Sequence, residues 1–125
     1  MEAISILVAD DNADSAESLA ILLTIEGHQV VTAADGAEAL ALADKIRPQA
    51  IFLDIGMPKL NGFDTCRMIR SRPWAQNTLL VAVTGWATDA DRARSRASGF
   101  NYHFAKPIDP QQVHKVLRAV AKTIV

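Results

Sequence analysis

The chain has 125 residues, half of them hydrophobic, with 13 lysines and arginines against 14 aspartates and glutamates. This length suits one domain with one core, and the net charge of −1 argues against the basic face that nucleic-acid binding needs. A single cysteine, Cys66, excludes an internal disulfide, and no apolar run approaches the roughly 18 residues of a membrane span. We therefore expect one cytoplasmic domain over residues 1–125, without a direct nucleic-acid or membrane partner.

The first part of the chain alternates strand and helix signals. An apolar run at residues 4–9 predicts a strand. Asp14 and Glu17 then have the spacing of a capping box, and leucines recur at helical intervals until Gly27, so we expect a helix there. The run at 28–33 predicts a second strand, after which the same unit repeats.

The remaining strands are expected at 50–54, 79–84 and 102–105. The first, third and fourth of the five strands are almost wholly hydrophobic, which is typical of strands covered on both faces. Five strand–helix units predict a parallel sheet with helices on both faces. The later helices are expected from Asp35 to about Arg47, from Asn61 to before Pro73, from Asp89 to Ser98, and from Pro110 along the stripe Val113, Val116, Leu117, Val120 and Ile124.

The helix at 89–98 has the weakest apolar face of the five. Only Ala90, Ala93 and Ala97 are expected to form that face, and alanine buries little area. We expect this helix to be the least firmly held. It is either a surface helix of modest amphipathicity or a mobile surface available to a partner.

Polar residues follow four of the five predicted strands. Asp10 and Asp11 follow the first strand, Asp54 ends the third, Thr84 ends the fourth and Lys106 follows the fifth. Because ligands of open parallel sheets bind beyond the carboxyl ends of the strands, we expect these side chains on one rim. Each residue alone could be a helix cap, a turn residue or a solvated side chain, but together on one rim they indicate a site.

These residue types suit phosphoryl transfer. Three close carboxylates raise one another's pKa or recruit a cation, and hard oxygen ligands favour Mg²⁺. A lysine ammonium and a threonine hydroxyl can contact phosphoryl oxygens, and an aspartate can be the nucleophile. We therefore predict that Asp54 accepts a phosphoryl group, with Mg²⁺ reducing the repulsion between its carboxylate and the anionic donor.

The chain resembles the receiver domains of two-component response regulators over essentially all of its length. The resemblance depends on the acid pair Asp10-Asp11, the segment LDIGMPKLNGFD around Asp54, Thr84 with Gly85 after it, and Lys106-Pro107. It implies a doubly wound, flavodoxin-like (βα)5 fold with the strand order 2-1-3-4-5. It also implies that the partner is a sensor histidine kinase or a phosphotransfer domain, which donates the phosphoryl group from a phosphohistidine.

The resemblance implies a role for each site residue. Asp54 would be the phosphoacceptor. Asp11, Asp54 and the Gly56 backbone carbonyl would bind Mg²⁺, and Asp10 would reach the metal through water. The surface of the fourth helix, fifth strand and fifth helix would pass the change to a downstream protein or an attached domain.

Lys106 would contact one phosphoryl oxygen, and Thr84 would hydrogen-bond to another and act as a switch. In receivers Thr84 works with a Tyr or Phe three residues before the lysine, and this chain has His103 there. His103 is either an exposed strand residue or a switch residue. In the second case we expect that protonation keeps the ring outside and weakens the coupling.

Two other functions fit part of this pattern. A haloacid-dehalogenase-type phosphatase also uses an aspartate and Mg²⁺, but it needs a second acid two residues after the nucleophile, where this chain has Gly56. A degenerate receiver would only bind a partner, although all the site residues are present here. We expect no enzyme activity beyond transfer and hydrolysis at Asp54. The chain stops with the fifth helix, so we expect either a stand-alone regulator or a segment of a longer protein such as a hybrid kinase.

Overall fold

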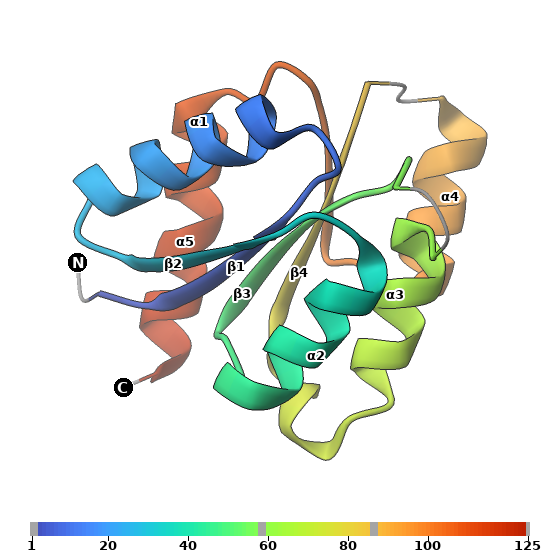
Figure 1. Ribbon diagram of the computed structural model, residues 1–125, viewed down its shortest axis with the longest axis horizontal. Coiled ribbons are helices and arrows are strands. Elements are labelled where there is room, and N and C mark those ends of the chain that lie inside the picture. Colours follow the sequence, from blue (N-terminus) through green and yellow to red (C-terminus); the bar gives the residue numbers. More distant parts are fainter. Residues whose placement is uncertain (1–2, 58–59, 86–87, 125) are drawn as a thin grey trace.

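The computed structural model describes residues 3–57, 60–85 and 88–124, with residues 121–124 described by their helical backbone alone. Five parallel strands form one sheet in the order β2-β1-β3-β4-β5, which confirms the expected topology (Figure 1). The strands are β1 (Ser5–Ala9), β2 (Gln29–Ala33), β3 (Ala50–Asp54), β4 (Leu79–Thr84) and β5 (Tyr102–Ala105). The helices are α1 (Ala13–Ile25), α2 (Gly36–Ile46), α3 (Gly62–Arg70), α4 (Asp89–Ser98) and α5 (Pro110–Ile124), with a short 3-10 helix, η1 (Pro73–Ala75).

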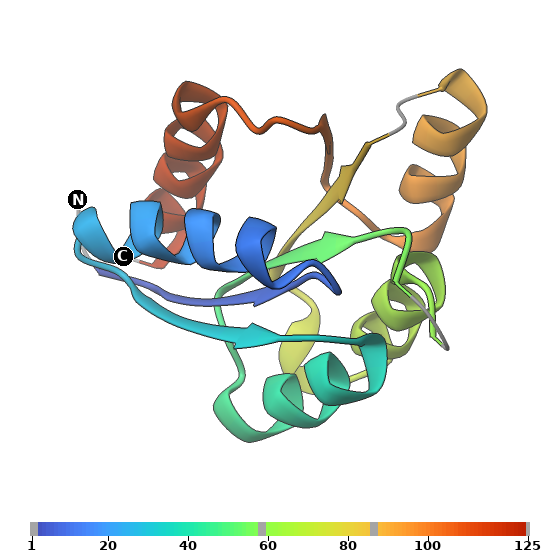
Figure 2. The ribbon, with the colours of Figure 1, turned by 45° about the horizontal axis from the view of Figure 1, so that its top comes forward.

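Helices cover the sheet on both faces. Helices α1 and α5 pack on one face and α2 and α3 on the other, with α4 beside α3 (Figure 1, Figure 2). Side chains alternate along each strand, so in β1 Ile6 and Val8 face α1 and α5, whereas Leu7 and Ala9 face α2 and α3. Strands β3 and β4 are buried along their whole length, as their hydrophobic runs predicted. Among the helices that the structure describes, none has the length and hydrophobicity to cross a bilayer.

The predicted strands are confirmed to within one residue at each end. Asp35 and Asn61 are the N-caps of α2 and α3, as expected. The predicted capping box at Asp14 is wrong, because the N-cap lies two residues earlier, at Asn12, whose side chain accepts the Ser15 N–H at 3.0 Å. An asparagine caps a helix as well as an aspartate does, and this early start places α1 directly after the acid pair.

The predicted apolar face of α4 is not the face that packs. Ala90, Ala93 and Ala97 are exposed, whereas Ser95 and Ser98 are buried. Burying an alanine gains little free energy, and a buried hydroxyl costs little when it has a hydrogen-bond partner. A prediction from hydropathy alone therefore identified the wrong face of this helix as the buried one.

Polar and aromatic contacts hold α4 to its neighbours. The Ser95 Oγ lies 2.7 Å from the His103 Nδ1 on β5, and the Arg67 guanidinium of α3 donates to the Ser98 Oγ at 3.4 Å. The Arg94 guanidinium lies over the Phe63 ring of α3, 4.2 Å from its centroid. The position of α4 thus depends on few specific contacts and little apolar area.

The apolar stripe of α5 is confirmed in its described part. Val113, Val116, Leu117 and Val120 are all buried in the core that α5 shares with α1 and the sheet. The side chain of Ile124, the last residue of the predicted stripe, lies outside the described residues.

Candidate functional site

The carboxyl ends of four strands bring the predicted site residues together on one rim. Asp10 and Asp11 follow β1, Asp54 ends β3, Thr84 ends β4 and Lys106 follows β5. Strand β3 is the central strand, with β1 on one side and β4 on the other. This order places Asp54 between the acid pair and the threonine.

Three carboxylates form a cluster at this rim. Asp10, Asp11 and Asp54 each place an oxygen within 4.8 Å of the others. Asp10 and Asp54 are only 6% and 9% exposed, whereas Asp11 is exposed. Because buried carboxylates repel one another unless a proton or a cation compensates them, this donor set fits a hard divalent cation.

Lys106 supplies a positive charge to the cluster. Its Nζ lies 2.8 Å from the Asp10 Oδ2 and 3.7 Å from the Asp54 Oδ2. Burial by itself would lower the pKa of Lys106, but the hydrogen bond to Asp10 and the charges of the three acids outweigh burial and raise it. The lysine is therefore an ammonium at neutral pH. The Lys106-Pro107 peptide bond is cis.

The turn after β3 holds the Asp54 side chain. Its Oδ1 accepts the Gly56 N–H at 3.1 Å. Burial raises the pKa of Asp54 to about 6, the Asp10 carboxylate adds to this rise, and the Gly56 hydrogen bond and the Lys106 charge oppose it. Gly62 at the start of α3 was not predicted to matter, but a Cβ there would lie 2.7 Å from the Asp54 carbonyl oxygen. Only glycine lets α3 approach the strand end that carries Asp54.

The raised pKa of Asp54 predicts a stability effect that depends on pH. The folded-state pKa of about 6 lies above the ordinary pKa of 3.8 for a free aspartate side chain. Folding therefore takes up a proton between about pH 4 and pH 6, and the ionised carboxylate destabilises the fold above this range. Without Mg²⁺, we expect Asp54→Asn to raise the free energy of unfolding by about 1 to 3 kcal/mol above pH 7 and by almost nothing near pH 4.

Urea unfolding of both proteins at the two pH values, in the presence of EDTA, measures this difference. If Asp54→Asn raised the free energy of unfolding equally at both pH values, the effect would come from packing and not from the charge of Asp54.

Thr84 and His103 lie on neighbouring strands. Thr84 is only 7% exposed, and β4 and β5 pair in a register that places Ala82 opposite His103. The His103 side chain is half-buried, and its ring is hydrogen-bonded to the Ser95 hydroxyl. The Arg92 guanidinium donates to the His103 backbone carbonyl at 3.2 Å. The reading of His103 as an exposed strand residue is therefore wrong as to its exposure, and its role as a switch residue stays a prediction.

The site opens into a pocket of about 560 Å³ between α1 and the segment that follows β5. Asp54 and Lys106 are among its polar lining residues, and Leu22 and Ile108 are among its apolar ones. Residues more than 80 positions apart in the sequence form this pocket, so local patterns could not predict it.

Comparison with known proteins agrees with this geometry. The family model of the response regulator receiver domain matches residues 6–118. The response regulator PleD of Caulobacter vibrioides is 34% identical over 117 residues, which cover 94% of this chain and 26% of PleD. The chain also spans only 45% to 50% of several other curated regulators that it matches, and 86% of a small relative from Leptolyngbya boryana.

Solved structures show the same fold. The chemotaxis protein CheY4 of Vibrio cholerae superposes with a TM-score of 0.88 at 29% identity, over 95% of this chain and 99% of that one. The receiver domain of the sensor histidine kinase PA1611 of Pseudomonas aeruginosa has a TM-score of 0.86 at 28% identity, over 94% and 97% of the two chains, and holds a magnesium ion in its active site cleft. With the family match over residues 6–118 and the acidic rim in place, the chain belongs to the response regulator receiver domains of two-component signalling.

Proposed function

We propose that residues 1–125 form one cytoplasmic receiver domain that is switched by phosphorylation of Asp54. The observation that supports this most is the Lys106 ammonium, 3.7 Å from the Asp54 Oδ2, beside a cluster of three carboxylates. A buried aspartate alone would repel an anionic phosphoryl donor, whereas a fixed ammonium and a cation site lower that repulsion. The proposed donor is a phosphohistidine of a sensor histidine kinase or of a phosphotransfer domain.

Mg²⁺ is the proposed cofactor. The carboxylates of Asp11 and Asp54 and the Gly56 backbone carbonyl would hold it, and Asp10 would contact it through water. A bound Mg²⁺ would neutralise charge on the acids and on the phosphoryl oxygens. The three carboxylates that lie within reach of one ion support this assignment. Burial first, and the nearby Asp10 carboxylate second, raise the pKa of Asp54, and a bound cation would offset both effects.

In the proposed transfer, a carboxylate oxygen of Asp54 attacks phosphorus. The bond between phosphorus and the donor's imidazole nitrogen breaks, the imidazole keeps the electron pair, and an acyl phosphate forms on Asp54. Lys106 donates to one phosphoryl oxygen and the Thr84 hydroxyl to another, so both stabilise the charge of the product. Later attack of water on phosphorus releases inorganic phosphate and restores the carboxylate. The domain thus turns over only its own aspartate.

Phosphorylation by a small donor tests the proposal. We expect acetyl phosphate with Mg²⁺ to add one phosphoryl group to the chain, and intact-protein mass spectrometry to detect it. Excess EDTA should prevent the addition and a further excess of Mg²⁺ should restore it, because the acids then regain their counter-charge. Labelling that is insensitive to EDTA would contradict the metal site, and no labelling under any condition would contradict the acceptor.

Thr84 and His103 are the proposed switch. If Thr84 moves toward the phosphoryl group, His103 on the next strand can turn inward and leave Ser95, which would release one of the contacts that hold α4. The surface of α4, β5 and α5 would then present the change to a downstream protein or an attached domain. We expect phosphorylation to shift the NMR signals of the His103 ring and of the α4 amides. Ring signals that stay in place while Asp54 is modified would rule out this role for His103.

A further inference from the structure

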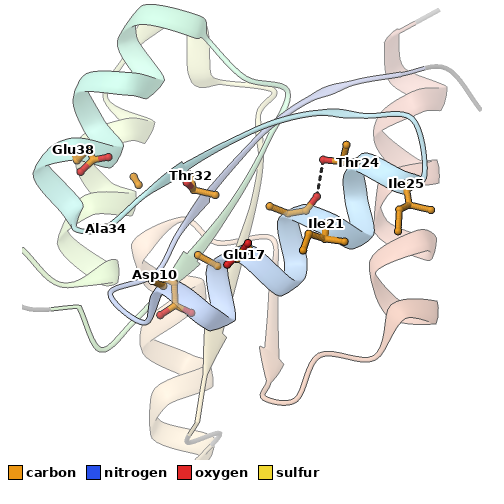
Figure 3. A pocket seen from close by; sticks show the side chains of 12 residues that line it. Asp10, Glu17, Ile21, Thr24, Ile25, Thr32, Ala34 and Glu38 are labelled. Carbon is orange, nitrogen blue, oxygen red and sulfur yellow. Dashed lines mark hydrogen bonds between the residues drawn. The ribbon is translucent and has the colours of Figure 1, made fainter.

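A second groove lies on the other side of α1, between α1 and the β2–α2 edge of the sheet. It has a volume of about 590 Å³ and runs from Asp10 along α1 to Ile25, with Glu38 of α2 at its opposite wall (Figure 3). Glu17, Ile21 and Ile25 line it at intervals of four residues, which is one turn of the helix. The proposed phosphoryl transfer uses none of the groove except Asp10.

The α1 wall of this groove is unusually apolar for a surface. Ile21 is 52% and Ile25 is 77% exposed, and they are two of the five large hydrophobic side chains that the described residues leave exposed. The Thr24 hydroxyl donates to the Ala20 carbonyl of its own helix at 2.7 Å, so it is satisfied without a partner (Figure 3). Covering two adjacent exposed isoleucines with another apolar surface removes them from water, which stabilises the resulting complex.

The charge of the groove selects the partner. Asp10, Glu17 and Glu38 line it, and no lysine, arginine or histidine is among its described lining residues. In a symmetric dimer through this face, Glu17 and Glu38 would meet acids of the second copy. A nucleic acid or an anionic lipid surface would also be repelled. A positively charged partner would instead be attracted by these carboxylates.

We propose that this groove binds an amphipathic helix of a partner protein. Large apolar side chains of that helix pack on Ile21 and Ile25, and its lysines or arginines lie opposite Glu17 and Glu38. The small side chains of Ala13 and Ala20 line the groove and leave room for the larger ones of the partner. This binding does not depend on phosphorylation of Asp54, because its apolar contacts lie on the other side of α1 from the pocket that Asp54 and Lys106 line.

The test uses the unphosphorylated protein and a synthetic helical peptide of about 16 residues, with leucines at helical spacing and lysines on both flanks. NMR titration should shift the amides of α1 and β2. Replacing both isoleucines, Ile21→Ser with Ile25→Ser, should weaken binding by about tenfold or more. A peptide with glutamates in place of the lysines should bind about tenfold more weakly to the unchanged protein, and Glu17→Lys should reduce this preference.

Met68→Ser is the matched control, because Met68 is an exposed hydrophobic residue on α3, away from the groove. It should leave the affinity unchanged, and urea unfolding should show that all variants keep their fold. The proposal is overturned if the double serine variant binds as well as Met68→Ser, or if the amide shifts lie on α4 instead of α1. A dimer in sedimentation equilibrium that the double serine variant dissociates would also overturn it, since the groove would then bind a second copy.

Discussion

Asp54→Asn is expected to abolish the phosphoryl adduct and to preserve the fold. Asparagine has almost the same shape as aspartate, so it can still accept the Gly56 N–H that positions Asp54 Oδ1. Its neutral amide oxygen is a poor nucleophile, and it removes one carboxylate from the proposed cation site. We expect labelling by acetyl phosphate and Mg²⁺ to fall by at least about a thousandfold, as judged by intact mass.

The matched control is Asp44→Asn on α2. Asp44 is an exposed carboxylate that accepts from Arg72 at 3.0 Å and from the Trp74 ring, and it lies outside the acidic rim. Its variant should be labelled as fast as the unchanged protein. Peptide mapping identifies the labelled residue if Asp54→Asn still forms an adduct. A persistent adduct on another residue, for example Asp10 or Asp11, would show that Asp54 is not the acceptor.

Arg70→Ala is expected to cause the largest loss of stability. Arg70 ends α3, and its Nε donates to the Gly99 carbonyl and its Nη2 to the Asn101 Oδ1, each at 2.8 Å. Its Nη1 donates to the Ala75 carbonyl at 2.9 Å and to the Thr78 carbonyl at 2.8 Å. One side chain thus ties the end of α3 to η1, to the residue before β4 and to the loop between α4 and β5.

Removing the guanidinium leaves several of these acceptors without a donor in a partly buried place. Hydrogen bonds from a charged donor are stronger than neutral ones, so we expect Arg70→Ala to lower the free energy of unfolding by about 3 to 5 kcal/mol. Gly99 depends on the same arrangement, because its φ of +110° favours glycine and a Cβ there would lie 2.8 Å from the Arg70 Cγ.

Arg72→Ala is the control for this prediction. Arg72 is a nearby arginine whose ion pair with Asp44 lies at the surface, with both side chains about one third or more exposed. Urea unfolding should show a loss below about 1 kcal/mol for this variant. Similar losses in the two variants would mean that the Arg70 hydrogen bonds contribute no more than a surface ion pair does.

Local sequence patterns predicted the strand and helix positions well, for physical reasons that act over a few residues. The hydrophobic runs of β3 and β4 are fully buried as expected, and Asp35 and Asn61 cap their helices through side-chain oxygens three residues from the bonded amide. The prediction failed at α4, where the buried residues are Ser95 and Ser98. Their burial depends on partners on other elements, which no helical period reveals.

The sequence by itself determined the order of the elements and the rim on which the acids, Thr84 and Lys106 lie, because parallel strands all end at the same edge of a sheet. Only the tertiary structure decided how close these groups come. Lys106 and Asp10 are 96 positions apart, yet their charged atoms lie 2.8 Å from each other. The same holds for the hydrogen bonds of Arg70 and the groove beside Ile21. Burial and electrostatic energy depend on which distant residues become neighbours, and that information exists only once the chain has folded.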